Sequence, residues 1–189
     1  MDARPRNTEQ LELLTDLELI AEINHGGEDA FAVLYHRHKE WVANLAYRWT
    51  GDRELALDVL QETFFYFARK FPGFSLTAKF HTFLYPVVRN LSISARRKTD
   101  RFQSEGIVPE AAEQAAPPTA LGDEENLRAA LAGLSEEHRE VLWLRFVDGL
   151  SLQEIAMAME IPLGTVKSRL HHGLETLRQD ERTKKSFEE

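Results

Sequence analysis

The residues of this 189-residue chain that could take part in covalent or metal chemistry are carboxylates and histidines. Asp58 and Glu62 are four positions apart, so on a helix they lie one turn apart and imitate a catalytic carboxylate pair, but no histidine or metal-ligand set accompanies them. His36 and His38 point in different directions on a helix, and we expect His38, on an apolar stripe, to be buried and hydrogen-bonded. The sequence has no cysteine and no glycine-rich phosphate loop. We therefore predict no catalytic residue, no metal site, no cofactor and no enzyme activity.

Clustered cations with interleaved aromatic side chains indicate nucleic-acid binding instead. Six basic residues lie between Lys79 and Arg101 against the single acid Asp100, which gives a local charge of 6 − 1 = +5. Cations neutralise phosphates and aromatic faces stack on unpaired bases, the combination that single-stranded DNA requires. A second stretch, from Pro162 to His172, contains no acid in a chain whose formal net charge is 23 − 31 = −8. Both stretches predict local DNA contacts, whereas the overall charge argues against a protein that binds DNA on its own.

A third set of residues predicts a protein-binding surface. By their spacing, Asp58, Gln61, Glu62 and Phe65 share one face of a helix. Carboxylates beside an exposed aromatic side chain are typical of an interaction surface, with the aromatic ring as its apolar anchor. The alternative is an ordinary solvated helix face, which would explain the acids but not an exposed Phe65.

Helices must position these residues, because apolar residues recur every three or four positions and alternating β-branched runs are missing. Thr15 and Glu18 have the spacing of a capping box. Pro86 removes a backbone hydrogen bond, so we expect the last helix of this part to start near Thr82 or to kink at Pro86. The predicted helices run from Thr15 to Gly26, Glu28 to Thr50, Asp52 to Phe71, and from near Thr82 to Lys98.

The amino-acid composition changes after this bundle. Residues 102–122 contain no Lys or Arg and three prolines, and such a polar stretch buries too little apolar surface to offset chain entropy. Shorter predicted helices follow, from Asp123 to Leu131, Ser135 to Gly149, Ser151 to Met159 and Leu163 to Gln179. The last two, joined by a tight connection, have the layout of a helix-turn-helix.

The sequence therefore predicts an all-α protein with two small helical domains, a four-helix bundle over residues 14–101 and a helix-turn-helix domain over residues 123–180. A flexible acidic linker over residues 102–122 joins them, with a flexible N-terminus over residues 1–13 and a tail over residues 181–189. The N-terminus is polar and no run of about 18 apolar residues occurs, so we expect a soluble, cytoplasmic protein without membrane insertion.

Several motifs of this chain closely resemble those of bacterial extracytoplasmic-function (ECF) sigma factors. The promoter-recognition domain of that family is matched by the runs LSEEHREVL (134–142), GLSLQEIA (149–156) and IPLGTVKSRL (161–170). DVLQETF (58–64) resembles the family's core-polymerase-binding segment, and FLYPVVRN (83–90) resembles its helix for the downstream promoter element, where the family commonly has Trp in place of Phe83. The resemblance spans roughly residues 14–178.

The resemblance implies an initiation subunit that binds core RNA polymerase, recognises the −35 and −10 promoter elements and promotes DNA melting. It implies contacts to the clamp helices of the largest polymerase subunit and to the flap, and an anti-sigma partner, but no small-molecule substrate. The polymerase-binding residues would be Asp58, Gln61, Glu62 and Phe65. The −10 residues would be Lys79, Phe83, Tyr85, Arg89, Asn90, Arg96 and Arg97, with a flipped base held by the loop from about Phe71 to Phe80 and the start of the next helix. The −35 residues would be Gly164, Thr165, Lys167, Ser168, Arg169, His171 and His172.

Two other functions fit parts of the sequence. A stand-alone helix-turn-helix regulator would use the N-terminal bundle for dimerisation or sensing. An antagonist that only titrates sigma-binding partners would not need the basic stretch between Lys79 and Arg101.

Overall fold

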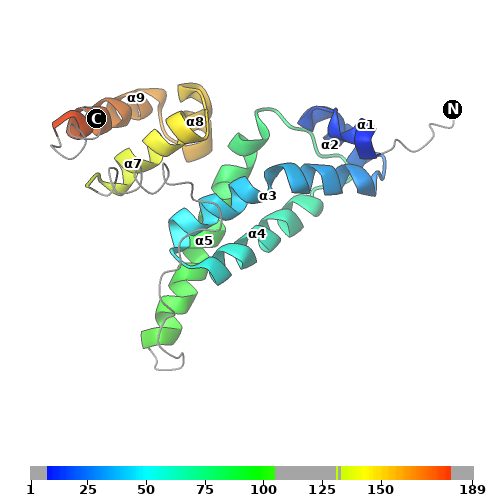
Figure 1. Ribbon diagram of the computed structural model, residues 1–189, viewed down its shortest axis with the longest axis horizontal. Coiled ribbons are helices and arrows are strands. Elements are labelled where there is room, and N and C mark those ends of the chain that lie inside the picture. Colours follow the sequence, from blue (N-terminus) through cyan, green and yellow to red (C-terminus); the bar gives the residue numbers. More distant parts are fainter. Residues whose placement is uncertain (1–7, 105–130, 132, 180–189) are drawn as a thin grey trace. The chain divides into compact units, whose positions relative to one another are not determined.

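A computed structural model describes residues 8–104, 131 and 133–179 of the chain. The chain divides into two compact units, Met1–Pro117 and Pro118–Glu189, and we describe each by itself (Figure 1). Within the described residues the regular secondary structure is entirely helical, which confirms the predicted all-α class. None of the described helices is both long enough and apolar enough to cross a membrane.

The first unit is a helical bundle in which α3, α4 and α5 pack on one another while α1 and α2 pack on α3 (Figure 1). Its helices are α1 (Thr8–Glu12), α2 (Asp16–Asn24), α3 (Glu28–Thr50), α4 (Arg53–Ala68) and α5 (Phe80–Ser104). Its interior is apolar, and its fully buried side chains include Leu34, Val42, Leu45, Phe67, Phe80, Leu84 and Val88. The segment between α4 and α5, residues 69–79, is named the α4–α5 loop below.

Local signals set most of the helix ends in this unit. Thr15 and Glu18 form the predicted capping box, in which the Thr15 backbone N–H donates to the Glu18 carboxylate at 2.8 Å. The helix α3 ends at Gly51, whose positive φ of 68° suits a residue without a Cβ. Asp52 caps α4 by accepting a hydrogen bond from the Leu55 backbone N–H at 3.0 Å.

Three predictions for the first unit were wrong. Residues 8–12 form α1 instead of belonging to a flexible N-terminus, because Leu11 is buried and Arg37 of α3 donates to the Glu12 carbonyl oxygen at 3.1 Å. The helix α4 ends at Ala68 rather than Phe71. The helix α5 begins at Phe80, close to the predicted start near Thr82, but it continues to Ser104, past both Lys98 and the predicted start of the linker, with Pro86 in its interior.

The second unit contains α7 (Glu136–Leu142), a π-helical turn η1 (Trp143–Val147), α8 (Leu152–Met159) and α9 (Leu163–Gln179). The predicted helix from Ser135 to Gly149 is thus interrupted, because its second half winds as η1. The predicted helix Leu163–Gln179 and the capping box of Ser151 with Glu154 are confirmed. Leu170, Leu174 and Leu177 of α9 pack against a core that includes Leu142 and Trp143.

The turn between α8 and α9 is short and has a specific backbone shape. Glu160 ends α8 in the left-handed conformation, with φ of 56°, and its backbone N–H donates to carbonyl groups of α8. The Pro162 carbonyl oxygen then accepts from the Thr165 backbone N–H at 2.9 Å at the start of α9. This connection gives α8 and α9 the predicted helix-turn-helix layout.

Other predictions fall on parts of the chain outside the described residues. These are the linker from residue 105 onward, the helix from Asp123 to Leu131 apart from Leu131 itself, residues 1–7, and the tail over residues 181–189.

Candidate nucleic-acid interface

The exposed face of α4 carries the residues predicted to bind a protein. Asp58, Gln61 and Glu62 are exposed, and Phe65 leaves 60% of its surface accessible to solvent. Leu57 and Tyr66, which sequence reasoning did not select, are also exposed and widen the apolar part of this surface. The helix therefore presents carboxylates and large apolar side chains together, as the spacing predicted.

Phenylalanine rings hold the α4–α5 loop against the ends of its two helices. The phenylalanine cluster consists of Phe67, Phe71, Phe74, Phe80 and Phe83. Phe67 and Phe80 are buried, whereas Phe83 is half-buried and lies 4.8 Å from Phe74 between ring centroids. Some of these rings therefore belong to the core of the bundle. Phe83, which was predicted to contact DNA, keeps part of its surface accessible for stacking.

The polar side chains predicted to contact DNA at the start of α5 and along it differ in how accessible they are. Lys79 at its start and Asn90, Arg96 and Arg97 along it are exposed. Arg89 is half-buried, with its guanidinium group 5.0 Å above the centroid of the Trp49 ring of α3, a favourable cation–π distance. Part of the +5 charge therefore also ties α5 to α3.

Tyr85 was predicted to contact DNA, and the structure contradicts this. Its side chain is fully buried, because α5 turns this position toward the core together with Leu84 and Val88. A buried ring offers no face on which an unpaired base could stack, so we exclude Tyr85 from the interface.

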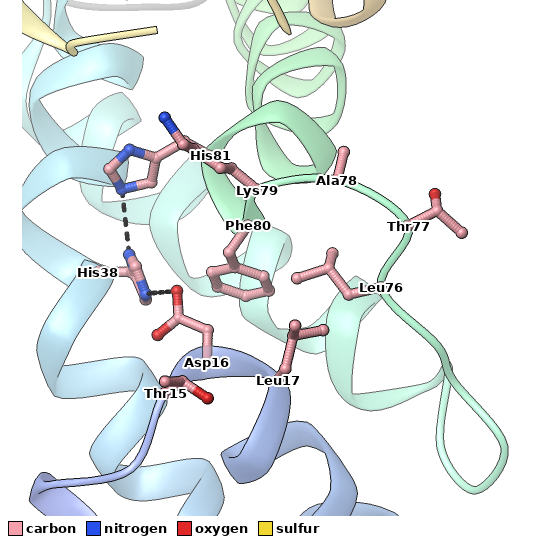
Figure 2. Close-up of a pocket in the computed structure, with 10 residues that line it drawn as sticks. All are labelled: Thr15, Asp16, Leu17, His38, Leu76, Thr77, Ala78, Lys79, Phe80 and His81. Carbon is pink, nitrogen blue, oxygen red and sulfur yellow. Dashed lines mark hydrogen bonds and ion pairs between the residues drawn. The ribbon is translucent and has the colours of Figure 1, made fainter.

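An open pocket of about 540 Å³ lies between the start of α2, His38 of α3 and the end of the α4–α5 loop (Figure 2). The loop and the first turn of α5 contribute Leu76, Thr77, Ala78, Lys79, Phe80 and His81, and the start of α2 contributes Asp16 and Leu17 beside Thr15. Figure 2 shows Phe80 in the middle of these side chains, with Leu76 and Leu17 next to it. The pocket thus combines apolar walls with a cation and imidazole groups at the place where the sequence predicted a base-binding loop.

A chain of polar side chains forms one wall of this pocket (Figure 2). His38 contacts the Asp16 carboxylate through Nε2 at 3.0 Å and the His81 Nε2 through Nδ1 at 3.1 Å. Arg37 completes the chain by donating to Asp16 at 2.7 Å, and the His81 ring stacks on Trp41 with centroids 4.0 Å apart. His38 is therefore buried and hydrogen-bonded, as predicted.

The same contacts fix the charge of Asp16. Partial burial opposes its charged form, but hydrogen bonds from His38 and Arg37 outweigh the burial and hold the pKa of Asp16 below its ordinary value of 3.8. Sequence reasoning missed Asp16 and His81, because they lie 22 and 43 positions from His38 and no local pattern connects them. Among the residues that the structure describes, no group of three side chains is arranged to hold a metal ion.

The outer face of α9 carries the residues predicted to enter a DNA groove. Gly164, Lys167, Ser168, His171 and His172 are exposed, and Thr165 is half-buried. Val166 is fully buried on the opposite side, which fixes the orientation of the helix.

Arg169, predicted in the same set, has a partner within its own unit. Its guanidinium group pairs with the Glu137 carboxylate of α7 at 2.8 Å, and its side chain is only 19% exposed. Arg169 therefore joins α9 to α7, a contact that charge patterning along α9 could not indicate.

The second unit also exposes large apolar side chains that sequence reasoning did not select. Phe146 and Val147 of η1 are 62% and 40% exposed, and Met157 of α8 is 54% exposed. Where such side chains form a contiguous patch, they mark a protein contact surface.

Comparisons with known proteins match both units. The model of sigma-70 region 2 matches residues 34–102, and that of sigma-70 region 4 matches residues 130–179. The chain is 30% identical over 179 residues to the ECF RNA polymerase sigma factor SigW of Bacillus subtilis (strain 168), covering 85% of this chain and 93% of the relative. It is 29% identical over 180 residues to the ECF RNA polymerase sigma-E factor of Escherichia coli (strain K12), covering 88% of this chain and 94% of the relative.

Solved structures give the same result for the fold. The sigma factor RpoE in complex with the anti-sigma factor NepR from Bartonella quintana superposes with a TM-score of 0.56 at 26% identity, over 75% of this chain and 89% of that chain. CnrH in complex with the cytosolic domain of CnrY superposes with a TM-score of 0.62 at 21% identity, over 86% of this chain and 94% of that chain.

The lowered pKa of Asp16 predicts a pH-dependent contribution to stability. A carboxylate whose pKa is lowered by folding stabilises the folded state above its unfolded pKa, and this stabilisation is lost as the pH falls through the folded pKa. We expect Asp16→Asn to lower the free energy of unfolding by about 1–2 kcal/mol at neutral pH, at the low end of the roughly 1.5–3 kcal/mol usual for hydrogen bonds to a charged group, because Asp16 is partly exposed. Denaturant titrations should show this deficit shrinking as the pH falls below about 4.

The control for this experiment is Asp100→Asn, which removes an exposed carboxylate of α5. It should change stability little at any pH. A deficit in Asp16→Asn that stays constant from neutral to acid pH would show that the carboxylate charge does not stabilise the fold.

Proposed function

The chain belongs to the ECF family of RNA polymerase sigma factors, and on that basis we propose which of its surfaces bind the polymerase and which bind the promoter. It is a promoter-recognising subunit that associates with core RNA polymerase for transcription initiation. The observation that carries this conclusion is that sigma-70 regions 2 and 4 match the two compact units in order. No observation favours a stand-alone regulator. We further propose that it acts in the cytoplasm and supplies no catalytic group, nucleotide addition being carried out by the core enzyme.

We propose that residues 8–104 form the polymerase- and −10-binding domain, which therefore starts earlier and ends later than the sequence predicted. The exposed face of α4 would bind the clamp helices of the largest polymerase subunit. Asp58 and Glu62 would set the register of that contact by charge, and Phe65 would be its apolar anchor.

The unpaired −10 strand would lie along the start of α5. The exposed cation of Lys79 suits a backbone phosphate, and the pocket beside it has the size and the apolar walls that suit a flipped base. Phe83 would supply a stacking surface, while Asn90, Arg96 and Arg97 would follow the strand along α5. Arg89 would act mainly by holding α5 on Trp49.

The second unit would contact both the −35 element and the polymerase. Gly164, Thr165, Lys167, Ser168, His171 and His172 would face the major groove, with Arg169 orienting α9 through Glu137. The exposed apolar side chains of Phe146, Val147 and Met157 would bind the polymerase flap. We also propose an anti-sigma partner, because two similar solved structures are complexes, one with an anti-sigma factor and the other with the cytosolic domain of CnrY.

Run-off transcription with purified core RNA polymerase tests the function. Templates with randomised upstream sequences should yield discrete transcripts from a selected subset only when this protein is added, because the core enzyme does not recognise promoters by itself. Sequencing that subset would define a promoter for the experiments below. If the protein binds these DNA fragments on its own but never produces discrete transcripts with core enzyme, the sigma-factor function is wrong.

Reversing one charge on α4 tests the polymerase-binding surface. Glu62→Lys should weaken association with core RNA polymerase at least about tenfold, because it places a cation where the clamp contact requires an anion. Its melting temperature should stay that of the wild type, since Glu62 is exposed. The control, Glu40→Lys, makes the same charge change at an exposed position of α3 and should bind core normally. Equal losses in both variants would assign the effect to net charge and not to this face of α4.

A comparison of two cations on α9 tests the −35 interface. Lys167→Ala should weaken binding to a duplex carrying the selected −35 element and reduce the slope of log K against log salt by about 1, the effect of losing one phosphate contact. Its unfolding free energy should change by less than about 0.5 kcal/mol, because Lys167 is exposed.

Arg169→Ala should lower the melting temperature as well, because it removes the pair with Glu137. Glu137→Gln provides the control, since it removes the same pair and keeps the cation. Because Arg169 is proposed to orient α9 and not to contact a phosphate, both variants should lose stability without the change in salt slope expected for Lys167→Ala. An unchanged salt slope in Lys167→Ala would contradict the proposed phosphate contact.

A further inference from the structure

The helix α2 contacts the α4–α5 loop through Asn24 at its C-terminal end, and its first residues line the same pocket as the end of that loop. We infer that α2, through Asn24, positions this loop to capture an unpaired base of the −10 strand. The inference rests on the base-binding role proposed above for the loop, and it assigns a function to a residue of α2 that does not line the proposed base pocket.

The side-chain amide of Asn24 makes three hydrogen bonds to the loop. Its Oδ1 accepts from the backbone N–H groups of Gly73 at 2.6 Å and Phe74 at 3.1 Å, and its Nδ2 donates to the Phe74 carbonyl oxygen at 2.7 Å. A primary amide is suited to this pattern, because it accepts with two lone pairs and also donates. A carboxylate of the same shape could accept these N–H groups but could not donate to the carbonyl.

The other end of α2 reaches the place where the loop enters α5. Asp16, the first residue of α2, accepts from His38, which contacts His81 in the first turn of α5. Leu17 of the same helix lines the pocket together with Leu76 of the loop. The helix α2 is therefore bonded directly to the first part of the loop, and it is linked through His38 of α3 to the turn that follows the loop.

The contact at Asn24 continues to a residue proposed to meet DNA. Asn24 holds Phe74 through both its backbone N–H and its carbonyl oxygen. The Phe74 ring in turn packs on Phe83, with ring centroids 4.8 Å apart. Gly73 has a φ of +96°, a conformation that side chains disfavour and that its hydrogen bond to Asn24 helps to maintain. Asn24 thus fixes the backbone that places Phe74 and, through it, Phe83.

Order in the loop before binding favours capture of a base. Fixing the backbone of a loop costs conformational entropy, and a loop that is ordered in advance does not incur this cost when it binds. Asn24 would act as a positioning residue in this sense, without touching DNA itself.

The test measures loop order and DNA capture in the same variants. The probe is a forked duplex of the promoter selected by run-off transcription, with its non-template strand unpaired over the −10 region. Since the chain has no cysteine, Ser75→Cys provides a single exposed site in the loop for a fluorescent dye. Asn24→Ala should raise the mobility of this dye, seen as lower anisotropy, and weaken binding of the unpaired strand about tenfold. Binding to core polymerase and to the −35 duplex should remain at the wild-type level.

Two further variants separate positioning from general damage. Asn24→Asp keeps the shape and the acceptor oxygen but loses the donor, and it should also weaken capture. Gly73→Ala disturbs the same backbone from the loop side, where an added Cβ meets no neighbouring atom, so its effect should be non-additive with Asn24→Ala. The matched control is His25→Ala, which removes an exposed neighbour bonded only locally to the Ala21 carbonyl oxygen and should bind the fork normally.

Three outcomes would overturn the inference. The first is wild-type capture by Asn24→Ala. The second is a parallel loss of core and −35 binding in both Asn24 variants, which would show that Asn24 only maintains the fold. The third is failure of the wild-type protein itself to bind the unpaired strand while it binds core, which would remove the proposed role of the loop and the role of Asn24 with it.

Discussion

The first unit depends on one junction, where a single guanidinium and a single carboxylate fix the N-terminal helices to α3. Arg37 donates to the Asp16 carboxylate and to the carbonyl oxygens of Glu12 and Leu14, so it closes the end of α1 and the beginning of α2 together. The same carboxylate accepts from His38, which contacts His81 at the start of α5. A change at this junction is therefore transmitted to α5, the helix that carries the basic stretch.

Cations in this protein serve two purposes that a sequence count cannot separate. Arg37, Arg89 and Arg169 lie against a carboxylate or an aromatic ring of their own unit. Arg96, Arg97 and Lys167 are exposed. A planar guanidinium suits the first purpose because it donates in several directions and stacks on rings. Some of the cations along α5 and α9 therefore attach these helices to their neighbours, and others create a positive surface potential. Only the exposed cations are available to phosphates.

The sequence predicted the features that depend on near neighbours and failed where distant segments meet. The capping boxes at Thr15 and Ser151 span three positions, so they were identified correctly. Asn24 and His81 act on partners 40 to 50 positions away, and no local pattern reveals them. Tyr85 was misplaced for a related reason, because its burial depends on what α3 and α4 place around α5.

Pro86 costs about 3 kcal/mol inside a helix. The helix α5 nevertheless continues through Pro86, and the burial of Leu84 and Val88 on either side of it contributes about 1.5–3 kcal/mol each against that cost.

Opposite charges on neighbouring helices give the first unit two surfaces with different preferences. The helix α4 exposes Asp58 and Glu62, while α5, which packs against it, exposes Arg96 and Arg97. Packed helices have axes about 8–10 Å apart, which is close to the Debye length of about 8 Å at physiological salt. Salt therefore weakens the influence of each surface on the other without removing it. On the proposed assignment, the positive surface of α5 would attract a DNA strand and the acidic face of α4 would repel it, which would leave that face open for a protein partner. The negative net charge of the chain opposes non-specific DNA binding without neutralising the basic stretch.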